Sequence, residues 1–337
     1  MTILAIETSC DDTAAAVLRN NEVLSNVISS QDVHNLYGGI VPELASREHV
    51  KGIAPIVQAA LVGANVKMSE VDAIAVTNGP GLPGSLLVGC HFAKGLALRH
   101  NLPLYAIHHI EAHLYSGYLE DPTLVYPSVC LVVSGGHTSI FYVESPSSYS
   151  VLGSTKDDAA GEAFDKVAKM IGLGYPGGPH IDRLAKKGNA EAFAFPRGLM
   201  NEESFDFSFS GLKTAVRRTI DELRRTGQEV PIADVCASAQ RAIVDVLVLK
   251  TMKAVRATNA RAVTIAGGVS ANSELRSRLS DVASSSGLRF VAPRMGYCVD
   301  NAAMIGYVAA LRSAEPAASA TDEFTISPKA LRSKFTP

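Results

Sequence analysis

The first pattern in the chain is a pair of apolar runs separated by a polar turn. ILAIE (residues 3–7) is apolar and suited to a strand, TSCDDT (8–13) is polar, and AAAVL (14–18) resumes the apolar run. A similar unit recurs at 129–143, where SGGHTS separates VCLVV from IFYV. Apolar runs joined by short polar turns predict hairpins. Their recurrence far along the chain suggests a duplicated architecture.

Helical periodicity fills the intervals between the predicted strands. Within 42–64, apolar residues at 53, 56, 57, 60 and 61 recur at helical spacing. Alternating phenylalanines in FDFSF (205–209) predict a strand instead. Further helices are expected at about 85–98, 212–225, 233–258 and 301–312, and further strands at 71–76, 103–107 and 262–265. Strands that alternate with helices indicate an α/β fold with substantial parallel pairing.

The length of 337 residues is typical of two domains. We expect an N-terminal lobe over 1–105 and a C-terminal lobe over 106–300. A C-terminal helix and tail then occupy 301–337, and we expect the helix to pack back on the first lobe.

Composition narrows the classes of partner and compartment. The chain has 31 Lys and Arg against 33 Asp and Glu, a formal net charge of −2, so no global basic field holds nucleic acid or anionic membrane. The best local basic patch is Lys213, Arg217, Arg218, Arg224 and Arg225 on one predicted helix. Five scattered cysteines form no CxxC pair, and neither a signal sequence nor a membrane-length apolar run is present. We therefore expect a reduced, cytoplasmic protein.

HHIEAH (108–113) is the sharpest candidate for metal chemistry. On a helix, His109 and His113 share one face and can bind one ion. Glu111 lies two residues after His109, on another side of the helix, so it cannot serve as the base of an HExxH protease. Asp300, just before the last predicted helix, is a candidate third ligand, although spacing alone cannot select it. Two imidazoles and one carboxylate would leave coordination positions open.

Several glycine-rich loops suggest a nucleotide site. GPGLPG (79–84) formally matches GxGxxG, but the next predicted strand does not end in an acidic residue, and two prolines remove N–H donors. Ser85 stands where a Walker A loop needs lysine. Three other loops, SGGHTS (134–139), YPGGPH (175–180) and AGGVSAN (266–272), expose backbone N–H groups that suit phosphates. Asp11 and Asp12, in the first turn, lie at the carboxyl end of a strand, where α/β sheets bind ligands.

Taken together, ten motifs in order resemble the TsaD family, the tRNA adenosine threonylcarbamoyltransferases. The matching motifs are IETSCDDT (6–13), GGIVPELASREH (38–49), NGPGLPGSLLVG (78–89), HHIEAH (108–113), VSGGHTS (133–139), DDAAGEAFDKVAK (157–169), YPGGP (175–179), FDFSFSGLKT (205–214), AGGVSAN (266–272) and CVDNAAMI (298–305). The resemblance implies the duplicated actin/Hsp70/sugar-kinase-like fold, with two lobes around a nucleotide-binding cleft. It also implies transfer of a threonylcarbamoyl group from L-threonylcarbamoyladenylate to N6 of adenosine 37, in tRNAs that read codons starting with A, with release of AMP.

The resemblance also assigns sites and partners. Metal ligands fall on His109, His113 and Asp300, with Fe(2+) or Zn(2+) as the ion. The adenylate-binding positions fall on Val132, Val133, Ser134, Gly135, Gly136, Asp165, Gly178, Asp182 and Asn272. A TsaB-like paralogue and a TsaE-like ATPase are the implied protein partners. Asp11 is our hypothesis for the catalytic base, and a homodimer is one option for the oligomeric state.

Three alternatives remain open from the residues alone. The HxxxH spacing allows a metalloprotease, and the fold class allows a sugar-kinase or Hsp70-like ATPase, because fold does not fix function. A non-catalytic scaffold subunit is the third.

Overall fold

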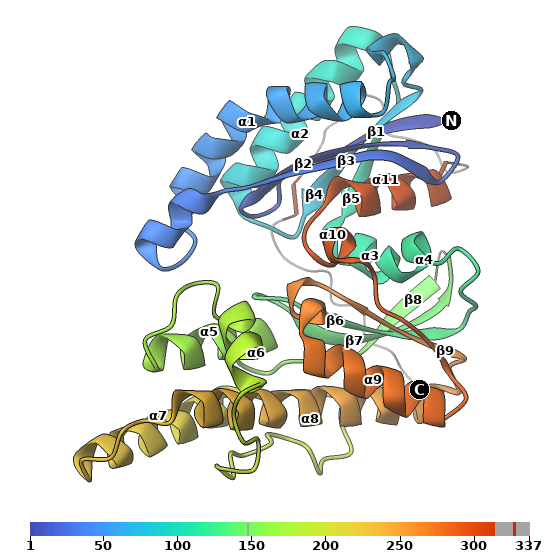
Figure 1. The fold of residues 1–337 in the computed structure, drawn as a ribbon. Helices are drawn as coiled ribbons and strands as arrows, with labels where there is room; N and C mark the ends of the chain where they lie inside the picture. Colours follow the sequence, from blue (N-terminus) through green and yellow to red (C-terminus); the bar gives the residue numbers. More distant parts are fainter. Residues whose placement is uncertain (147, 314–325, 328–337) are drawn as a thin grey trace. The chain divides into compact units, whose positions relative to one another are not determined.

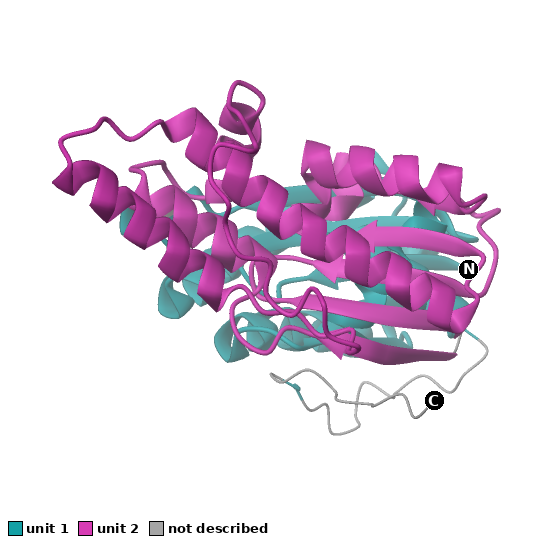
Figure 2. Cartoon of the chain, turned by 90° about the horizontal axis from the view of Figure 1, so that it is seen from below, with its two compact units in different colours: residues 1–120, 299–331 teal, residues 121–298, 332–337 magenta. Residues whose placement is uncertain are grey.

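The computed structural model describes residues 1–146, 148–313 and 326–327. Within these residues the chain divides into two compact units (Figures 1 and 2). Of the described residues, unit 1 contains 1–120, 299–313 and 326–327, and unit 2 contains the others between 121 and 298. The division therefore falls after Glu120, whereas we expected it after residue 105, and the return falls after Cys298. The reason is local: β5 pairs with β4, and the two short helices after β5 pack against the last helix.

Unit 1 is built on a five-stranded sheet in the order β3-β2-β1-β4-β5. β1 to β3 form an antiparallel meander, and β4 and β5 add parallel to β1. The strands are β1 (Thr2–Glu7), β2 (Asp12–Arg19), β3 (Glu22–Ser30), β4 (Ala73–Gly79) and β5 (Leu104–His108). The helices are η1 (Asp32–Tyr37), α1 (Pro42–Gly63), η2 (Met68–Glu70), α2 (Pro83–His100), α3 (His109–Leu114), α4 (Ser116–Glu120) and α11 (Ala302–Leu311).

Helices cover both faces of this sheet, which explains why β1 is apolar at successive positions. Leu4 and Ile6 belong to the core under α1 and α2. On the other face α11 packs against β1 and β2 (Figure 1). There Gly306 lies so close to Leu18 and Ala5 that a Cβ at position 306 would come within 2.2 Å of a Leu18 methyl carbon.

Unit 2 repeats the same strand pattern in the order β8-β7-β6-β9-β10. Again three strands form an antiparallel meander, and two add in parallel. The strands are β6 (Ser128–Val133), β7 (Thr138–Ser145), β8 (Ser148–Ser154), β9 (Ala262–Ala266) and β10 (Arg289–Val291). The helices are α5 (Ala160–Met170), α6 (Gly177–Ala185), α7 (Ser210–Arg225), α8 (Ile232–Thr258), η3 (Gly268–Ala271), α9 (Ser273–Ser285) and α10 (Met295–Cys298). The duplication expected from the two hairpins is confirmed by this matching topology.

The strand expected at 205–209 is not formed. Phe207 makes a single parallel bridge to Thr155, and α7 begins at Ser210. The alternation has another cause, because Phe207 and Phe209 are both buried and their rings stack with centroids 6.2 Å apart. Asp206 between them accepts a hydrogen bond from the Ser154 amide. The alternating burial of residues 205–209 therefore comes from a short extended segment that pairs with Thr155, just after the end of β8.

Candidate metal centre and nucleotide loops

Helix α3 places two imidazoles on one face, immediately after strand β5. His109 is the first residue of α3 and His113 follows one turn later, as helical spacing predicts. Both residues are buried, their ring centroids lie 4.7 Å apart, and the ring planes are perpendicular.

Asp300 reaches the same point from the other end of the chain. It immediately precedes Asn301, which caps α11 by accepting a hydrogen bond from the Met304 amide. The Asp300 Oδ1 atom lies 3.1 Å from Nε2 of His113 and 3.4 Å from Nε2 of His109. The three residues each offer one ligand atom, and these atoms lie within 4.8 Å of one another. The structure therefore brings together the three predicted ligands.

Glu7 is a fourth member of this cluster that sequence reasoning missed. Its Oε2 atom lies 3.0 Å from Nδ1 of His109 and accepts a hydrogen bond of 2.5 Å from the Thr77 hydroxyl, while Oε1 accepts from the Ser9 amide. Glu7 is fully buried at the end of β1. The signal in the sequence was a lone carboxylate that closes the apolar run ILAIE. A carboxylate behind a ligating histidine fixes its tautomer and orientation.

The electrostatics of the cluster favour a cation. Burial lowers the pKa of His109, but the negative charges of Asp300 and Glu7 outweigh it, so the pKa rises well above its ordinary value. Burial also opposes ionisation of Asp300, yet the neighbouring His109 holds the pKa of that carboxyl well below its usual range. For His113, burial dominates and lowers the pKa, which leaves a neutral imidazole suited to ligation. Two carboxylates therefore converge on one buried position that attracts positive charge.

The residues present fit a divalent transition metal. Two imidazole nitrogens and one carboxylate oxygen suit iron or zinc, and three protein ligands leave positions open for a substrate. Nδ1 of His113 is buried and has no hydrogen-bond partner among the described residues, so this imidazole is not saturated by the protein.

Glu111 does not take part in this cluster. Its carboxylate is buried, and both of its oxygens accept from Nη2 of Arg312, at 2.6 and 2.7 Å. A zincin base must be free to take a proton from a bound water, so the ion pair is a second reason, besides its position on the helix, why Glu111 cannot be the base of a metalloprotease.

The predicted nucleotide loops lie in unit 2. In SGGHTS the Ser134 amide donates to the His137 carbonyl, and the Ser134 carbonyl accepts from the Gly161 amide. A Cβ at Gly161 would come within 2.6 Å of that carbonyl, so this close approach requires glycine. Gly135, Gly136 and Gly178 instead have no described atom within 4 Å of the place where a Cβ would be. Their main chain is therefore open to a ligand.

The polar residues expected around these loops already make hydrogen bonds within the protein. Asp165 accepts from the Gly177 amide at 2.7 Å, at the start of α6, and Asp182 accepts from the amide and hydroxyl of Ser273. Asn272 caps α9 by accepting from the Leu275 amide and donates 2.7 Å to Gln240. Asn272 keeps one free amide hydrogen at most for a ligand.

Comparisons with known proteins place the chain in one family. The family model TsaD, tRNA N6-adenosine threonylcarbamoyltransferase, matches residues 22–307. A protein of that name from Moorella thermoacetica is 52% identical over 309 residues, which cover 91% of this chain and 90% of the relative. Another, from Clostridioides difficile, is 50% identical over 305 residues, covering 90% of each. The chain belongs to the TsaD family.

Solved structures show that this TsaD chain has the actin/Hsp70/sugar-kinase-like fold. Full-length HypF, in a phosphate- and nucleotide-bound form, aligns with a TM-score of 0.62 and 15% identity, over 94% of this chain and 47% of that one. The (R)-2-hydroxyglutaryl-CoA dehydratase component A of Acidaminococcus fermentans aligns with a TM-score of 0.56 and 14% identity, over 94% of this chain and all of that one. These identities support the fold alone. Membership in the TsaD family makes this chain a transferase that acts in tRNA modification.

The first turn of this TsaD chain carries the two acids that the sequence analysis named, Asp11 and Asp12. Asp11, our candidate base, is half-buried beside Cys10. Its neighbour Asp12 is the perturbed group: burial raises the pKa of Asp12 to about 7, and the charges of Asp300 and Asp11 add to this against a hydrogen bond from Ser30. Perturbed carboxylates gather at functional sites.

The basic helix of the TsaD chain is α7. Arg217, Arg218 and Arg224 are exposed, whereas Arg225 is paired with Glu222 at 2.6 Å. A hollow of about 150 Å³ between α5 and α7 is lined by Met170, Arg217, Ile220, Asp221 and Arg224. Among the described residues, no helix combines the length and apolarity needed to cross a bilayer.

Proposed function

We propose that this protein transfers the threonylcarbamoyl group of L-threonylcarbamoyladenylate to N6 of adenosine 37, in tRNAs that read codons starting with A, in the cytoplasm. N6 bonds to the carbamoyl carbon, the bond from that carbon to the phosphate oxygen breaks, and AMP leaves with the electron pair. The observation that carries the proposal is the convergence of His109, His113 and Asp300 on one point in a TsaD chain.

His109, His113 and Asp300 would hold one Fe(2+) or Zn(2+). A bound ion of this kind acts as a Lewis acid on a carbonyl oxygen. The protein's own part is to orient the imidazoles, with Nδ1 of His109 donating to Glu7. This leaves Nε2 of His109 facing the carboxylate of Asp300.

The adenylate would be held by the loops of unit 2. We assign Val132, Val133, Ser134, Gly135 and Gly136 to the phosphate and its surroundings, because open glycine main chain lets N–H groups approach a phosphate. Asp165, Gly178, Asp182 and Asn272 would line the rest of the adenylate site. Asp165 would act through α6, whose first amide it already holds.

The nucleophile needs both delivery and a proton acceptor. The N6 amine is a poor nucleophile, so an unstacked anticodon-loop base must be positioned against the carbonyl. Asp11 remains our candidate for the group that takes the N6 proton, and the raised pKa of Asp12 makes it the natural comparison. The matched variants Asp11→Asn and Asp12→Asn show which of the two carboxylates is the base. The variant that lacks the base should have a lower kcat and still bind tRNA.

The tRNA backbone would contact the exposed arginines of α7. Their guanidinium groups suit phosphates, and those of Arg217 and Arg224 border the hollow beside α5. A TsaB-like paralogue and a TsaE-like ATPase complete the proposed assembly.

The test is nucleoside mass analysis of unmodified tRNA after incubation with the protein and L-threonylcarbamoyladenylate, with and without the two partner proteins. We expect threonylcarbamoyladenosine with the wild type, loss of it in His109→Ala, and no change in His91→Ala, an exposed histidine on α2. Absence of product in every wild-type mixture, together with steady ATP hydrolysis in the absence of tRNA, would replace this proposal with the ATPase alternative.

A further inference from the structure

We propose that the ion pair between Glu111 and Arg312 is a positioning clamp, which holds α3 and α11 in the register at which the three metal ligands converge. The inference rests on the metal centre of the proposed function and adds two positioning residues to it. Neither residue touches the expected ion, since both Glu111 oxygens are held by Arg312.

The pair joins the helix that carries two of the ligands to the helix that follows the third. Glu111 lies between His109 and His113 on α3, so a shift of Glu111 moves both imidazoles. Asp300 lies just before the cap of α11, Asn301, and Arg312 immediately follows the helix. A helix of ten residues is about 15 Å long and rigid on that scale, so a displacement at one end of α11 is carried to the other.

The packing of α11 against the sheet is almost entirely apolar. AAMIGYVAAL presents small and apolar side chains on every side, and apart from the Tyr307 hydroxyl these carry no strong hydrogen-bonding group. Apolar burial is non-directional. The close approach of Gly306 to Leu18 and Ala5 limits how far α11 can move along β1 and β2, and directional polar contacts at its ends add to this limit.

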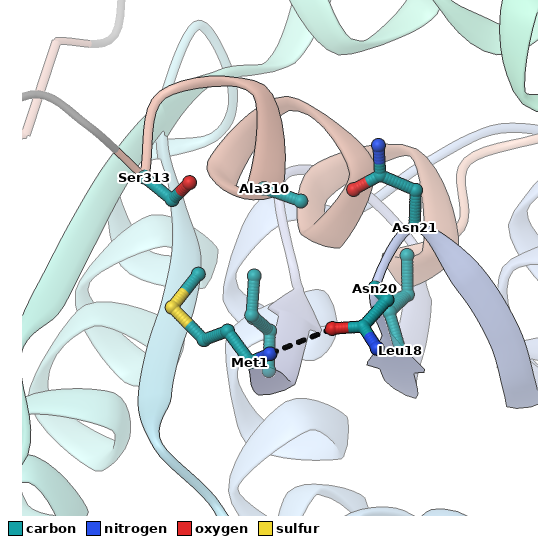
Figure 3. Close-up of a pocket in the computed structure, with 7 residues that line it drawn as sticks. Met1, Leu18, Asn20, Asn21, Ala310 and Ser313 are labelled. Carbon is teal, nitrogen blue, oxygen red and sulfur yellow. Dashed lines mark hydrogen bonds between the residues drawn. The ribbon is translucent and has the colours of Figure 1, made fainter.

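Polar contacts fix α11 at its two ends. At the first end, the Asn301 cap and a hydrogen bond from the Ala303 amide to Asn26 Oδ1 hold the helix. At the far end, a hollow of about 380 Å³ borders Ala310 and Ser313, so dense packing does not hold this side (Figure 3). Arg312 supplies the directional contact there, and its cation also suits the C-terminal end of a helix.

The experiment measures metal binding rather than catalysis, with Co²⁺ as the probe and its visible d–d absorption as the signature of coordination geometry. Arg312→Gln and Glu111→Gln should each weaken Co²⁺ binding by about tenfold or more, the range seen for groups that support ligands. The double variant should lose no more than either single one, because the two substitutions break one interaction. Arg312→Lys should retain part of the affinity.

The matched control is Arg99→Gln, an exposed arginine in the last turn of α2, which should bind Co²⁺ as the wild type does. Unchanged affinity and spectrum in folded Arg312→Gln, or additive losses in the double variant, would overturn the clamp and leave the metal centre standing. Failure of the wild type to bind Co²⁺ would overturn both. If Arg312→Gln does not fold, the folded variants Arg312→Lys and Glu111→Gln provide the test. An unaltered Co²⁺ spectrum in both of them would refute the clamp.

Discussion

Replacing Glu7 with glutamine should weaken metal binding while the protein stays folded. The carboxylate of Glu7 accepts from the Ser9 amide, the Thr77 hydroxyl and Nδ1 of His109. A glutamine has only one acceptor oxygen, so at least one of these buried donors must face an NH₂ group. The substitution also removes the negative charge that supports the His109 ring.

The size of the effect follows from what Glu7 contributes. Loss of a carboxylate behind a ligating histidine typically lowers metal affinity by about 10- to 100-fold. At about 1.4 kcal/mol for each factor of ten, this corresponds to about 1.4–2.8 kcal/mol. The metal affinity of Glu7→Asp should fall between those of the wild type and Glu7→Gln, since aspartate keeps the charge on a side chain that is one methylene shorter.

The assay is competition for Zn²⁺ between the protein and a chromophoric chelator, at a pH near 7.5, with circular dichroism as the check on folding. Glu48→Gln is the matched control, because Glu48 pairs only with Lys51 on the surface of α1 among the described contacts. If folded Glu7→Gln binds Zn²⁺ within about twofold of the wild type, His109 does not depend on Glu7, and our description of the cluster is mistaken.

Three further predictions concern unit 2. Phe164→Ala truncates a core side chain that is 1% exposed, so urea unfolding should show a loss of about 3–5 kcal/mol, and a loss below about 1 kcal/mol would contradict the packing described. Burial opposes ionisation of Asp157, but hydrogen bonds from Ser208, Phe209 and Ser210 outweigh it and lower the pKa of the carboxyl. The ionised carboxylate should therefore stabilise the fold fully above its unfolded-state pKa, and this stabilisation should disappear as the pH falls through the lower folded-state pKa. Asp157→Asn should shrink the difference in urea midpoint between pH 6 and pH 3, and an unchanged difference would refute this. Gly161→Ala should displace the SGG loop and weaken adenylate binding, measured by calorimetry. Gly211→Ala, at an open position on α7, is the control that should bind the adenylate as the wild type does. Equal affinities of the two variants for the adenylate would count against the loop as the binding site.

The local pattern of the sequence was enough to identify much of the fold. The two hairpins could be predicted because apolar runs and small turns encode strands and their reversals. The shared face of His109 and His113 could be predicted because helical spacing is a local property. The alternation in FDFSF misled us, since the same pattern of burial arises from a short segment whose phenylalanines stack in a helical core.

Only the tertiary structure decided which distant groups join the two histidines. Asp300 is 187 residues from His113, and Glu7 is 102 residues from His109. Their meeting depends on β1 lying in the centre of its sheet and on α11 returning to pack against it. Apolar periodicity specifies that such elements are buried, but it does not specify their partners, because hydrophobic burial has no direction. The order of strands and the polar contacts at the ends of helices supply that information, and they exist only once the chain has folded.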